Sequence, residues 1–293
     1  MSGIKSSRDR IFDFINITLL TFLMVITLYP FLYVIFASLS DPSRIMAYPG
    51  LLYKPLGFSL GAYKAVIKNP NIFTGYVNTC FLVTVGVAVN ITMTALGAYF
   101  LSRKNVLWGK VVMFFIVFTM FFNGGLIPLY FTVKGLRLDN SLCALILPTA
   151  INTFNLIIMR TAFMAIPDSI EESAKIDGAG HLLILFRIIV PLAMPTIAVM
   201  ILFYGVGHWN AWFQAMIFLQ NRELFPLQLI LREILLMNDS FQMAMGANVG
   251  DQEMISETIK YAVIIVATLP ILCLYPFLQK YFVKGVMVGS LKE

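Results

Sequence analysis

Residues 71–102 read NIFTGYVNTCFLVTVGVAVNITMTALGAYFLS, a stretch of 32 residues without one Asp, Glu, Lys or Arg. A transmembrane helix needs about 20 apolar residues to cross a hydrocarbon core of roughly 30 Å, so this stretch is long enough to span a bilayer. Strands of a transmembrane barrel alternate in polarity over about 10 residues, whereas this stretch is apolar on every face. The stretch therefore predicts a membrane-spanning helix.

Five further stretches of the chain lack charged residues and reach, or come within a residue of, the spanning length. They are 15–40, 111–133, 140–159, 188–221 and 261–279. Of the 293 residues, 59% are hydrophobic and 12% are charged, against roughly 25% charged in soluble domains. This composition excludes a soluble enzyme and predicts an all-α membrane protein with six transmembrane helices.

An even number of spans places both termini on one side of the membrane, and basic residues beside the spans choose the side. The connecting segments on the side of the termini carry a net charge of +5, against +1 for the other side. Lys and Arg favour the cytoplasmic side, so both termini are expected in the cytoplasm. The basic residues that flank the spans most closely are Arg8, Arg10, Arg103, Lys104, Lys280 and Lys284.

These spans predict four parts of the chain. They are a cytoplasmic N-terminal segment at 1–14, a first transmembrane helix with an external loop at 15–70, a core domain at 71–279 that contains a cytoplasmic loop at 167–190, and a cytoplasmic tail at 280–293.

The connection 222–260 is predicted to be a long external loop. Loops of more than about 12–15 residues are usually functional or disordered, so contact with an external partner is expected. The residues expected to make this contact are Phe241, Met243 and Met245, because Met-rich apolar stretches adapt to a partner's surface.

The cytoplasmic segment 166–179, IPDSIEESAKIDGA, predicts a short helix. Ser169 followed by Glu172 has the spacing of a capping box, so the helix is expected to begin there. It is expected to end at Gly178, because glycine enters the left-handed conformation of a helix end without the cost of a Cβ. The pattern alone leaves open an amphipathic helix on the lipid surface and an element that docks on another protein.

The residue pattern of this segment resembles that of the EAA loop of the ATP-binding-cassette (ABC) import permeases. Glu172-Ser173-Ala174, three residues, Gly178, nine residues and then 188–191 (IIVP) repeat the family pattern Glu-Ala-Ala-x3-Gly-x9-Ile-x-Leu-Pro. Ser173 replaces an alanine and Val190 replaces a leucine, and neither change alters the spacing.

Further stretches resemble the carbohydrate-uptake branch of this family. Residues 170–179 (IEESAKIDGA) are similar to the group of the maltose transporter's smaller permease. Residues 123–128 (NGGLIP), 155–161 (NLIIMRT) and 281–290 (YFVKGVMVGS) resemble the subgroup that imports plant or algal oligosaccharides.

The resemblance implies an ABC importer permease fold in the plasma (inner) membrane of a bacterium, and a set of partners. These are a second homologous permease, two cytoplasmic ATPase subunits that hold ATP and Mg, and an external solute-binding protein. It also implies that Glu172 faces basic groups of an ATPase and that Ala174 lies against its surface. The residues expected to couple the chain to the ATPase are Glu171, Glu172, Ser173, Ala174, Asp177, Gly178 and Ala179.

The chain itself is not expected to be an enzyme or to hold a cofactor. It contains no Gly-x4-Gly-Lys-Ser/Thr phosphate loop, so ATP must be hydrolysed on separate subunits. No metal site is expected either, because His181 and His208 lie far apart and no third ligand accompanies them, and the three cysteines are isolated.

Polar side chains inside predicted spans are candidates for a translocation path, because an unpaired polar group is costly in hydrocarbon. The candidates are Asn152, Asn155, Tyr204, His208, Asn210 and Gln214, and aromatic rings together with amides suit a sugar. The alternative is that such groups join helices, and Trp209 and Trp212 belong to an aromatic belt. For Asn78 and Asn90, helix joining is the favoured interpretation.

These observations favour the permease subunit of an ABC importer for an oligosaccharide. Basic groups on the external side would help to steer a uronate-containing one, although eight acidic residues share that side. The alternative is an ion-coupled secondary transporter of a small solute, which usually carries Asp, Glu, Lys or Arg at membrane depth, where the six stretches have none. A membrane enzyme is a third hypothesis, and no paired carboxylates or nucleophile elbow support it.

Overall fold

The computed structural model describes residues 7–104, 106–244 and 258–273, with side chains omitted for 7–8 and 237–244. This part of the chain is helical and contains no strand, only an isolated bridge between Ser40 and Phe58. The all-α prediction is therefore confirmed. Contacts divide the chain into two compact units, one of 1–69 with 233–268 and one of 70–232 with 269–293.

The first unit contains the long helix α1 (Ser7–Ser38), which covers all but the last two residues of the predicted first span, 15–40. The segment predicted as an external loop at 41–70 is partly helical, because it contains α2 (Pro42–Met46) and α3 (Gly61–Lys68). The side chain of Asp41 caps α2 by accepting a hydrogen bond from the backbone N–H of Ser43. The Ser38 and Tyr63 hydroxyls lie 2.8 Å apart and join the end of α1 to α3.

The second unit contains the stretch 71–102, which forms one continuous helix as predicted. Its parts are α4 (Pro70–Phe81), the π-helical turn η1 (Leu82–Gly86) and α5 (Val87–Ser102). Asp9–Ser38 and Pro70–Ser102 are the two described helices that are long and apolar enough to cross a membrane.

Three other apolar stretches, each predicted as one membrane-spanning segment, form bent helix pairs. α6 (Gly109–Phe121) and α7 (Leu126–Gly135) meet at 115°, and His181–Leu192 meets α13 (Met194–Trp209) at 89°. Cys143–Thr149, made of α8 (Cys143–Ile146) and η2 (Leu147–Thr149), meets α9 (Thr153–Met164) at 53°. Up to five spans result if each pair counts as one, and the shorter apolar helix Thr258–Cys273 is additional.

The bend between α6 and α7 has a local cause in the sequence 123–125. The side-chain oxygen of Asn123 accepts a hydrogen bond from the N–H of Gly125 at 2.8 Å. Gly125 has φ +87°, in the region that residues with a Cβ rarely enter. The chain therefore turns inside an apolar stretch for which composition alone predicts one spanning helix.

The connection 222–260 is largely helical, so its prediction as a loop was wrong. It contains η4 (Arg222–Leu224) and α15 (Leu227–Ala244), and Leu227, Ile230 and Leu231 are buried at helical spacing. Phe241 and Met243 lie in the last turns of α15, where side chains are not described, and Met245 lies outside the described residues, as does the tail 280–293.

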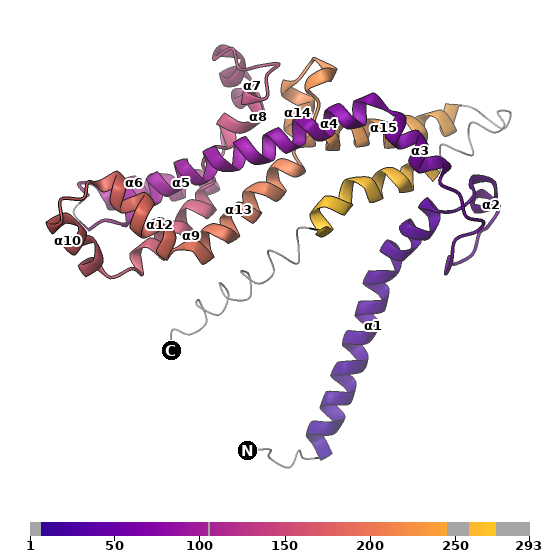
Figure 1. Cartoon of the computed structure of the whole chain (residues 1–293), viewed down its shortest axis with the longest axis horizontal. Coiled ribbons are helices and arrows are strands. Elements are labelled where there is room, and N and C mark those ends of the chain that lie inside the picture. The colour runs from indigo at the N-terminus through magenta and orange to yellow at the C-terminus, as the bar shows by residue number, and fades with distance from the viewer. Residues whose placement is uncertain (1–6, 105, 245–257, 274–293) are drawn as a thin grey trace. The chain divides into compact units, whose positions relative to one another are not determined.

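The core of the second unit forms where α5, α9 and α13 lie side by side (Figure 1). Ala95 and Ala98 of α5 are buried there, and small residues let membrane helices approach closely. At one end of these helices the core continues into α10 (Asp168–Ile176), α11 (His181–Ile184), η3 (Leu185–Ile189) and α12 (Val190–Leu192), which precede α13.

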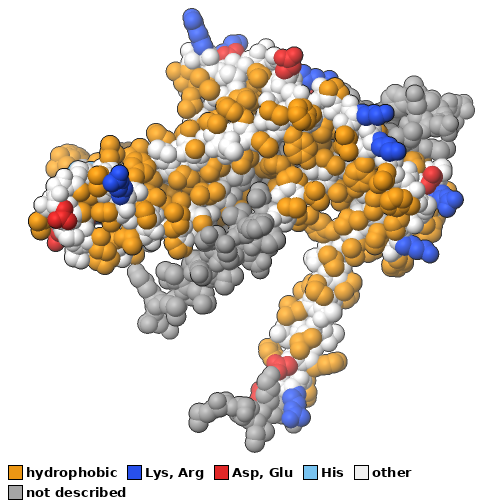
Figure 2. Space-filling view, in the orientation of Figure 1, with side chains coloured by type: hydrophobic (Ala, Val, Ile, Leu, Met, Phe, Trp, Pro, Cys, Tyr) orange, Lys and Arg blue, Asp and Glu red, His pale blue; other side chains and the backbone are white. Residues whose placement is uncertain are grey.

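Hydrophobic side chains cover the flanks of the helices, as expected for contact with lipid (Figure 2). Phe114 is 64% exposed and Phe121 is 76% exposed. Charged side chains lie near helix ends, among them those around α10.

Candidate functional site

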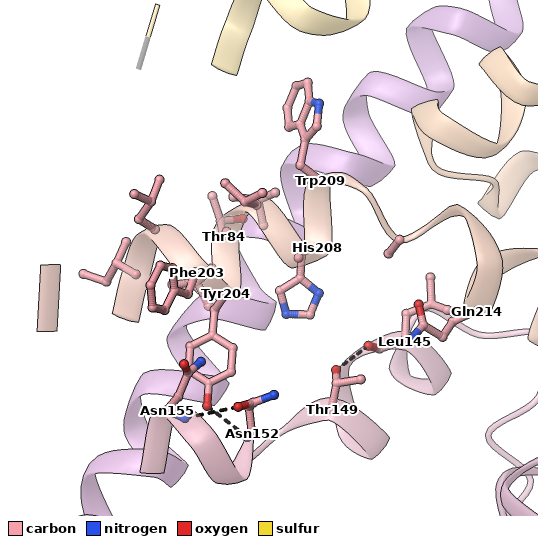
Figure 3. A pocket seen from close by; sticks show the side chains of 18 of the residues that line it. Thr84, Leu145, Thr149, Asn152, Asn155, Phe203, Tyr204, His208, Trp209 and Gln214 are labelled. Atoms are coloured by element: carbon pink, nitrogen blue, oxygen red, sulfur yellow. Dashed lines mark hydrogen bonds between the residues drawn. The ribbon is translucent and has the colours of Figure 1, made fainter. Parts of the chain in front are cut away.

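The second unit contains a cavity of about 1250 Å³ in which most of the predicted path residues meet (Figure 3). Its walls come from η1, the start of α5, η2, α9, α13 and α14 (Trp212–Phe218). The predicted path residues that line it are Asn152, Asn155, Tyr204, His208 and Gln214. Asn210 does not line it, because Asn210 is exposed at the end of α13 and its amide donates to the carbonyl of Val206 at 3.0 Å.

One wall of the cavity is the break between η2 and α9, where backbone groups need partners outside a helix. The Tyr204 hydroxyl accepts a hydrogen bond from the N–H of Asn152 at 3.0 Å and lies 2.8 Å from the Thr94 hydroxyl. The side chain of Asn152 caps α9 by accepting from the N–H of Asn155 at 3.1 Å. Tyr204 therefore joins α13 to both α5 and the start of α9.

A second polar contact ties α5 to α13 beside the cavity. Asn90 is buried, and its amide donates to the carbonyls of Thr149 at 2.7 Å and Ala150 at 3.0 Å. Its side-chain oxygen therefore faces Nε2 of His208 at 2.6 Å, which assigns the donated proton to that nitrogen. Gly86 permits this approach, because a Cβ there would lie 2.5 Å from Nε2.

The structure confirms that Asn78 and Asn90 join helices. The amide of Asn78 donates to the carbonyls of Glu223 at 2.7 Å and Phe225 at 3.1 Å, far away in sequence. His208 lines the cavity and also holds Asn90, so it joins helices beside the cavity.

The cavity wall is neutral and partly aromatic. None of its lining residues is Asp, Glu, Lys or Arg. Phe154, Phe203, Tyr204 and Trp209 supply rings, and the indole N–H of Trp209 is a buried donor without a hydrogen-bond partner within the described part of the chain. Rings stack on the apolar face of a sugar and amides bind its hydroxyl groups.

The cytoplasmic segment forms the predicted helix, α10, but the predicted start was wrong. The helix begins at Asp168 after Pro167, and no side chain caps it, so Ser169 and Glu172 do not form a capping box. Pro167 has φ −58° and ψ 135°, the extended backbone that precedes a helix. Asp168 in the first turn is favourable beside the positive end of the helix dipole, and it pairs with Lys104.

The predicted end of α10 at Gly178 is confirmed. Gly178 has φ +83°, its N–H donates to the carbonyl of Lys175 at 3.0 Å, and the N–H of Ala179 donates to that of Ala174 at 2.9 Å. This pair of hydrogen bonds is the Schellman motif, which satisfies the last carbonyls of a helix.

The residues predicted to couple the chain to an ATPase occupy two opposite faces of α10 and its end. Glu172, Ser173, Asp177 and Gly178 are exposed, Ala179 is half-buried, and Glu171 and Ala174 are buried in the chain itself. The methyl group of Ala174 packs in the core of this unit, because Ala174 lies three residues after Glu171 on the inner face of α10. This packing favours a role inside the chain over the expected contact with another subunit.

Glu171 is held by three side chains beneath α10. It forms an ion pair with Arg103, its Oε1 accepts from Lys175 at 2.9 Å, and the Tyr99 hydroxyl donates to Oε1 at 3.3 Å. The same hydroxyl lies 3.2 Å from Nδ1 of His181. Burial raises the pKa of Glu171, but the hydrogen bond from Lys175 and the charge of Arg103 outweigh it and hold that pKa below its usual range.

Sequence reasoning missed this role of Arg103. The residue was noticed as a basic flank of a span, and its distance of 68 residues from Glu171 hid the pairing. In the described residues, no cluster of three or more His, Cys, Asp or Glu side chains could hold a metal ion.

The continuous helix Pro70–Ser102 and the broken helices around a neutral cavity are the features of an α-helical membrane protein. A model of the family described as "binding-protein-dependent transport system inner membrane component" matches residues 91–288, and the chain belongs to this family. The resemblance to ABC import permeases found in the sequence is thereby confirmed.

Two of the similar proteins carry a polysaccharide in their names. The chain is 41% identical over 285 residues to the polygalacturonan/rhamnogalacturonan transport system permease protein YtcP of Bacillus subtilis (strain 168), covering 97% of this chain and 99% of that protein. It is 40% identical over 288 residues to protein LplC of the same organism, covering 98% and 97%. A chain in the crystal structure of a bacterial ABC transporter involved in the import of the acidic polysaccharide alginate superimposes with a TM-score of 0.87 at 33% identity, covering 96% of this chain and 100% of that one.

Proposed function

We propose that this permease forms, with a second homologous permease, the translocation path for a uronate-containing oligosaccharide. Polygalacturonan and alginate, the polymers in the names of two similar proteins, are both built from uronic acids. The observation that carries the proposal is the cavity of about 1250 Å³, whose aromatic and amide lining suits a carbohydrate. The chain that contains this cavity belongs to the binding-protein-dependent transport family.

In this proposal the chain lines one side of the path through the cavity. Tyr204, Asn152, Asn155 and Gln214 offer hydroxyl and amide groups to sugar hydroxyls, and Phe203 with Trp209 offers apolar faces. Because the wall is neutral, it lets a carboxylate pass without a charged partner that would hold it. Weak and distributed contacts suit transport, which requires that the substrate also leaves.

ATP is hydrolysed on two separate cytoplasmic subunits that hold ATP and Mg, and α10 docks on one of them. Its outer face carries Glu172, Ser173 and Asp177, and Ile176 is 87% exposed among them. A large apolar side chain surrounded by polar ones is typical of a docking surface.

The six spans and the cytoplasmic position of both termini belong to this proposal.

An external solute-binding protein delivers the sugar in this proposal and contacts the segment around Phe241, Met243 and Met245. Deletion of 240–248 is expected to abolish the stimulation of ATP hydrolysis by the loaded binding protein and to leave basal hydrolysis unchanged. Unchanged stimulation would remove this contact from the proposal.

The proposal is tested by uptake in proteoliposomes that contain the full complex and the loaded binding protein. ATP inside the vesicles is expected to drive the uptake of labelled oligogalacturonides, and unlabelled oligogalacturonides are expected to compete better than neutral galactose oligomers of the same length. Uptake driven by a proton or sodium gradient without ATP would favour the ion-coupled alternative. Equal competition by the neutral oligomers would contradict the uronate assignment.

A further inference from the structure

The helix α5 makes side-chain contacts at two levels, and these connect the cavity with α10. Towards its start, Asn90 contacts His208 and Thr94 contacts Tyr204, both of which line the cavity. At its other end, Tyr99 and Arg103 contact Glu171 of α10. Thirteen residues separate Asn90 from Arg103, which is about 20 Å along a helix.

The contact with Glu171 is buried. The side chains of Arg103 and Glu171 are 17% and 7% exposed, so little solvent screens their attraction. The same two segments are joined by a second ion pair, Lys104 with Asp168, whose side chains are 81% and 53% exposed. Exposed pairs of this kind contribute little to the position of a helix.

The guanidinium group of Arg103 is fixed by further contacts. It donates to the Ser102 hydroxyl at 3.0 and 3.1 Å and lies 4.8 Å from the centre of the Tyr99 ring. From α9, Arg160 donates to the carbonyl of Leu101 at 2.8 Å and so ties the end of α5 to α9. The end of α5 is therefore a rigid anchor for the carboxylate of Glu171.

We infer that Glu171 and Arg103 form the joint through which movement of α10 reaches α5 and, along α5, the cavity wall. Glu171 is thus a positioning residue that acts through Arg103, whereas the outer face of α10 meets the ATPase. This inference rests on the proposed function, because it assigns the joint to the coupling of ATP hydrolysis to transport.

The test compares two isosteric variants that each neutralise one acidic residue of α10. Glu171→Gln removes the charge from the buried pair, and Asp168→Asn removes it from the exposed pair between the same segments. Both are measured in the full complex in proteoliposomes, as ATPase subunits retained per permease, ATP hydrolysed, and oligogalacturonide taken up per ATP.

Glu171→Gln is expected to retain the ATPase subunits and their hydrolysis within about twofold, and to lower uptake per ATP about tenfold or more. Asp168→Asn is expected to stay within about twofold of wild type in all three quantities. The double variant Arg103→Glu with Glu171→Arg reverses the pair and is expected to restore part of the uptake per ATP, which loss of folding alone would not allow.

Wild-type uptake per ATP in Glu171→Gln would overturn the inference and leave the proposed function intact, whereas a wild-type complex without ATP-driven uptake would overturn both. Loss of the ATPase subunits in proportion to uptake would place Glu171 at the docking surface instead. If Glu171→Gln does not fold, the variant Arg103→Lys provides the test. It keeps the positive charge but loses the planar guanidinium group that can bind a carboxylate with two parallel hydrogen bonds. Uptake per ATP is expected to fall severalfold in this variant. Unchanged uptake per ATP in Arg103→Lys would overturn the inference.

Discussion

The two ends of α5 are joined to neighbouring helices by different kinds of polar contact. Beside the cavity, α5 is tied to α13 by neutral groups, Asn90 with His208 at 2.6 Å and Thr94 with Tyr204 at 2.8 Å. At the other end, Arg103 is paired with Glu171. Charges are costly at membrane depth, whereas a helix end near water accepts them. The kind of polar contact that α5 makes therefore depends on how close that part of the helix lies to water.

The largest expected loss of stability comes from breaking the neutral contact through Asn90. Asn90→Leu keeps the approximate volume and removes every side-chain hydrogen bond of that residue, which leaves two carbonyls and His208 without this partner. The free energy of unfolding is expected to fall by about 3 kcal/mol, because buried polar groups left unpaired cost about 1–3 kcal/mol each. The measurement is denaturant unfolding in detergent, and a loss below about 1 kcal/mol would show that the contact is dispensable.

A smaller loss is expected when the same contact is disturbed by volume. Gly86→Ala places a Cβ 2.5 Å from Nε2 of His208, so the ring must move away from Asn90. Overpacking of this kind costs about 1–3 kcal/mol. Gly205→Ala is the matched control, because a Cβ there meets Val87 at an ordinary 3.9 Å. Equal unfolding temperatures for the two variants would contradict the close approach.

At the charged end, the helix stop at Gly178 is expected to matter more for coupling than for stability. Nothing lies within 4 Å of a Cβ at this residue, so the cost of Gly178→Val comes only from the backbone strain of a φ of +83°. The backbone strain is about 1–2 kcal/mol. Because the turn also sets the direction of α10, we expect normal insertion and pairing with the second permease, with ATPase subunits lost or ATP hydrolysed without uptake. Wild-type uptake and ATPase content would show that α10 docks without this turn.

The smallest change in stability is expected on the outer face of α10. Glu172 is exposed, so Glu172→Lys is expected to change the free energy of unfolding by less than about 0.5 kcal/mol. The amount of ATPase co-purified per permease is nevertheless expected to fall, because in the proposed docking Glu172 faces basic groups of the ATPase and the reversed charge would be repelled by them. Full retention of ATPase would remove Glu172 from the docking surface.

The sequence predicts features that depend on neighbouring residues and misses those that depend on distant ones. The helix Pro70–Ser102 and the stop at Gly178 were predicted because an uncharged stretch and a glycine act locally. The bend between α6 and α7 was missed, although Asn123 followed by two glycines was a signal for it.

Two further errors have the same origin. The charged residues that interrupt α15 predict a loop, whereas the apolar spacing from Leu227 to Leu231 indicates the helix that is observed. The sequence does not distinguish the inward-facing Glu171 from its neighbour Glu172, because the partner of Glu171, Arg103, lies 68 residues away. Which acid faces inward is therefore a tertiary property.

The central claim is that α10 presents its outer face to an ATPase while its inner face is held by this chain. It is tested most directly by cross-linking in the assembled complex, after the native cysteines Cys80, Cys143 and Cys273 are replaced by serine. A reagent that joins thiols to amines is applied to single-cysteine variants at positions 172, 174 and 176. The account predicts permease–ATPase products from Glu172→Cys and Ile176→Cys and none from Ala174→Cys. A product from Ala174→Cys as abundant as the others, or no product from any of the three, would contradict it.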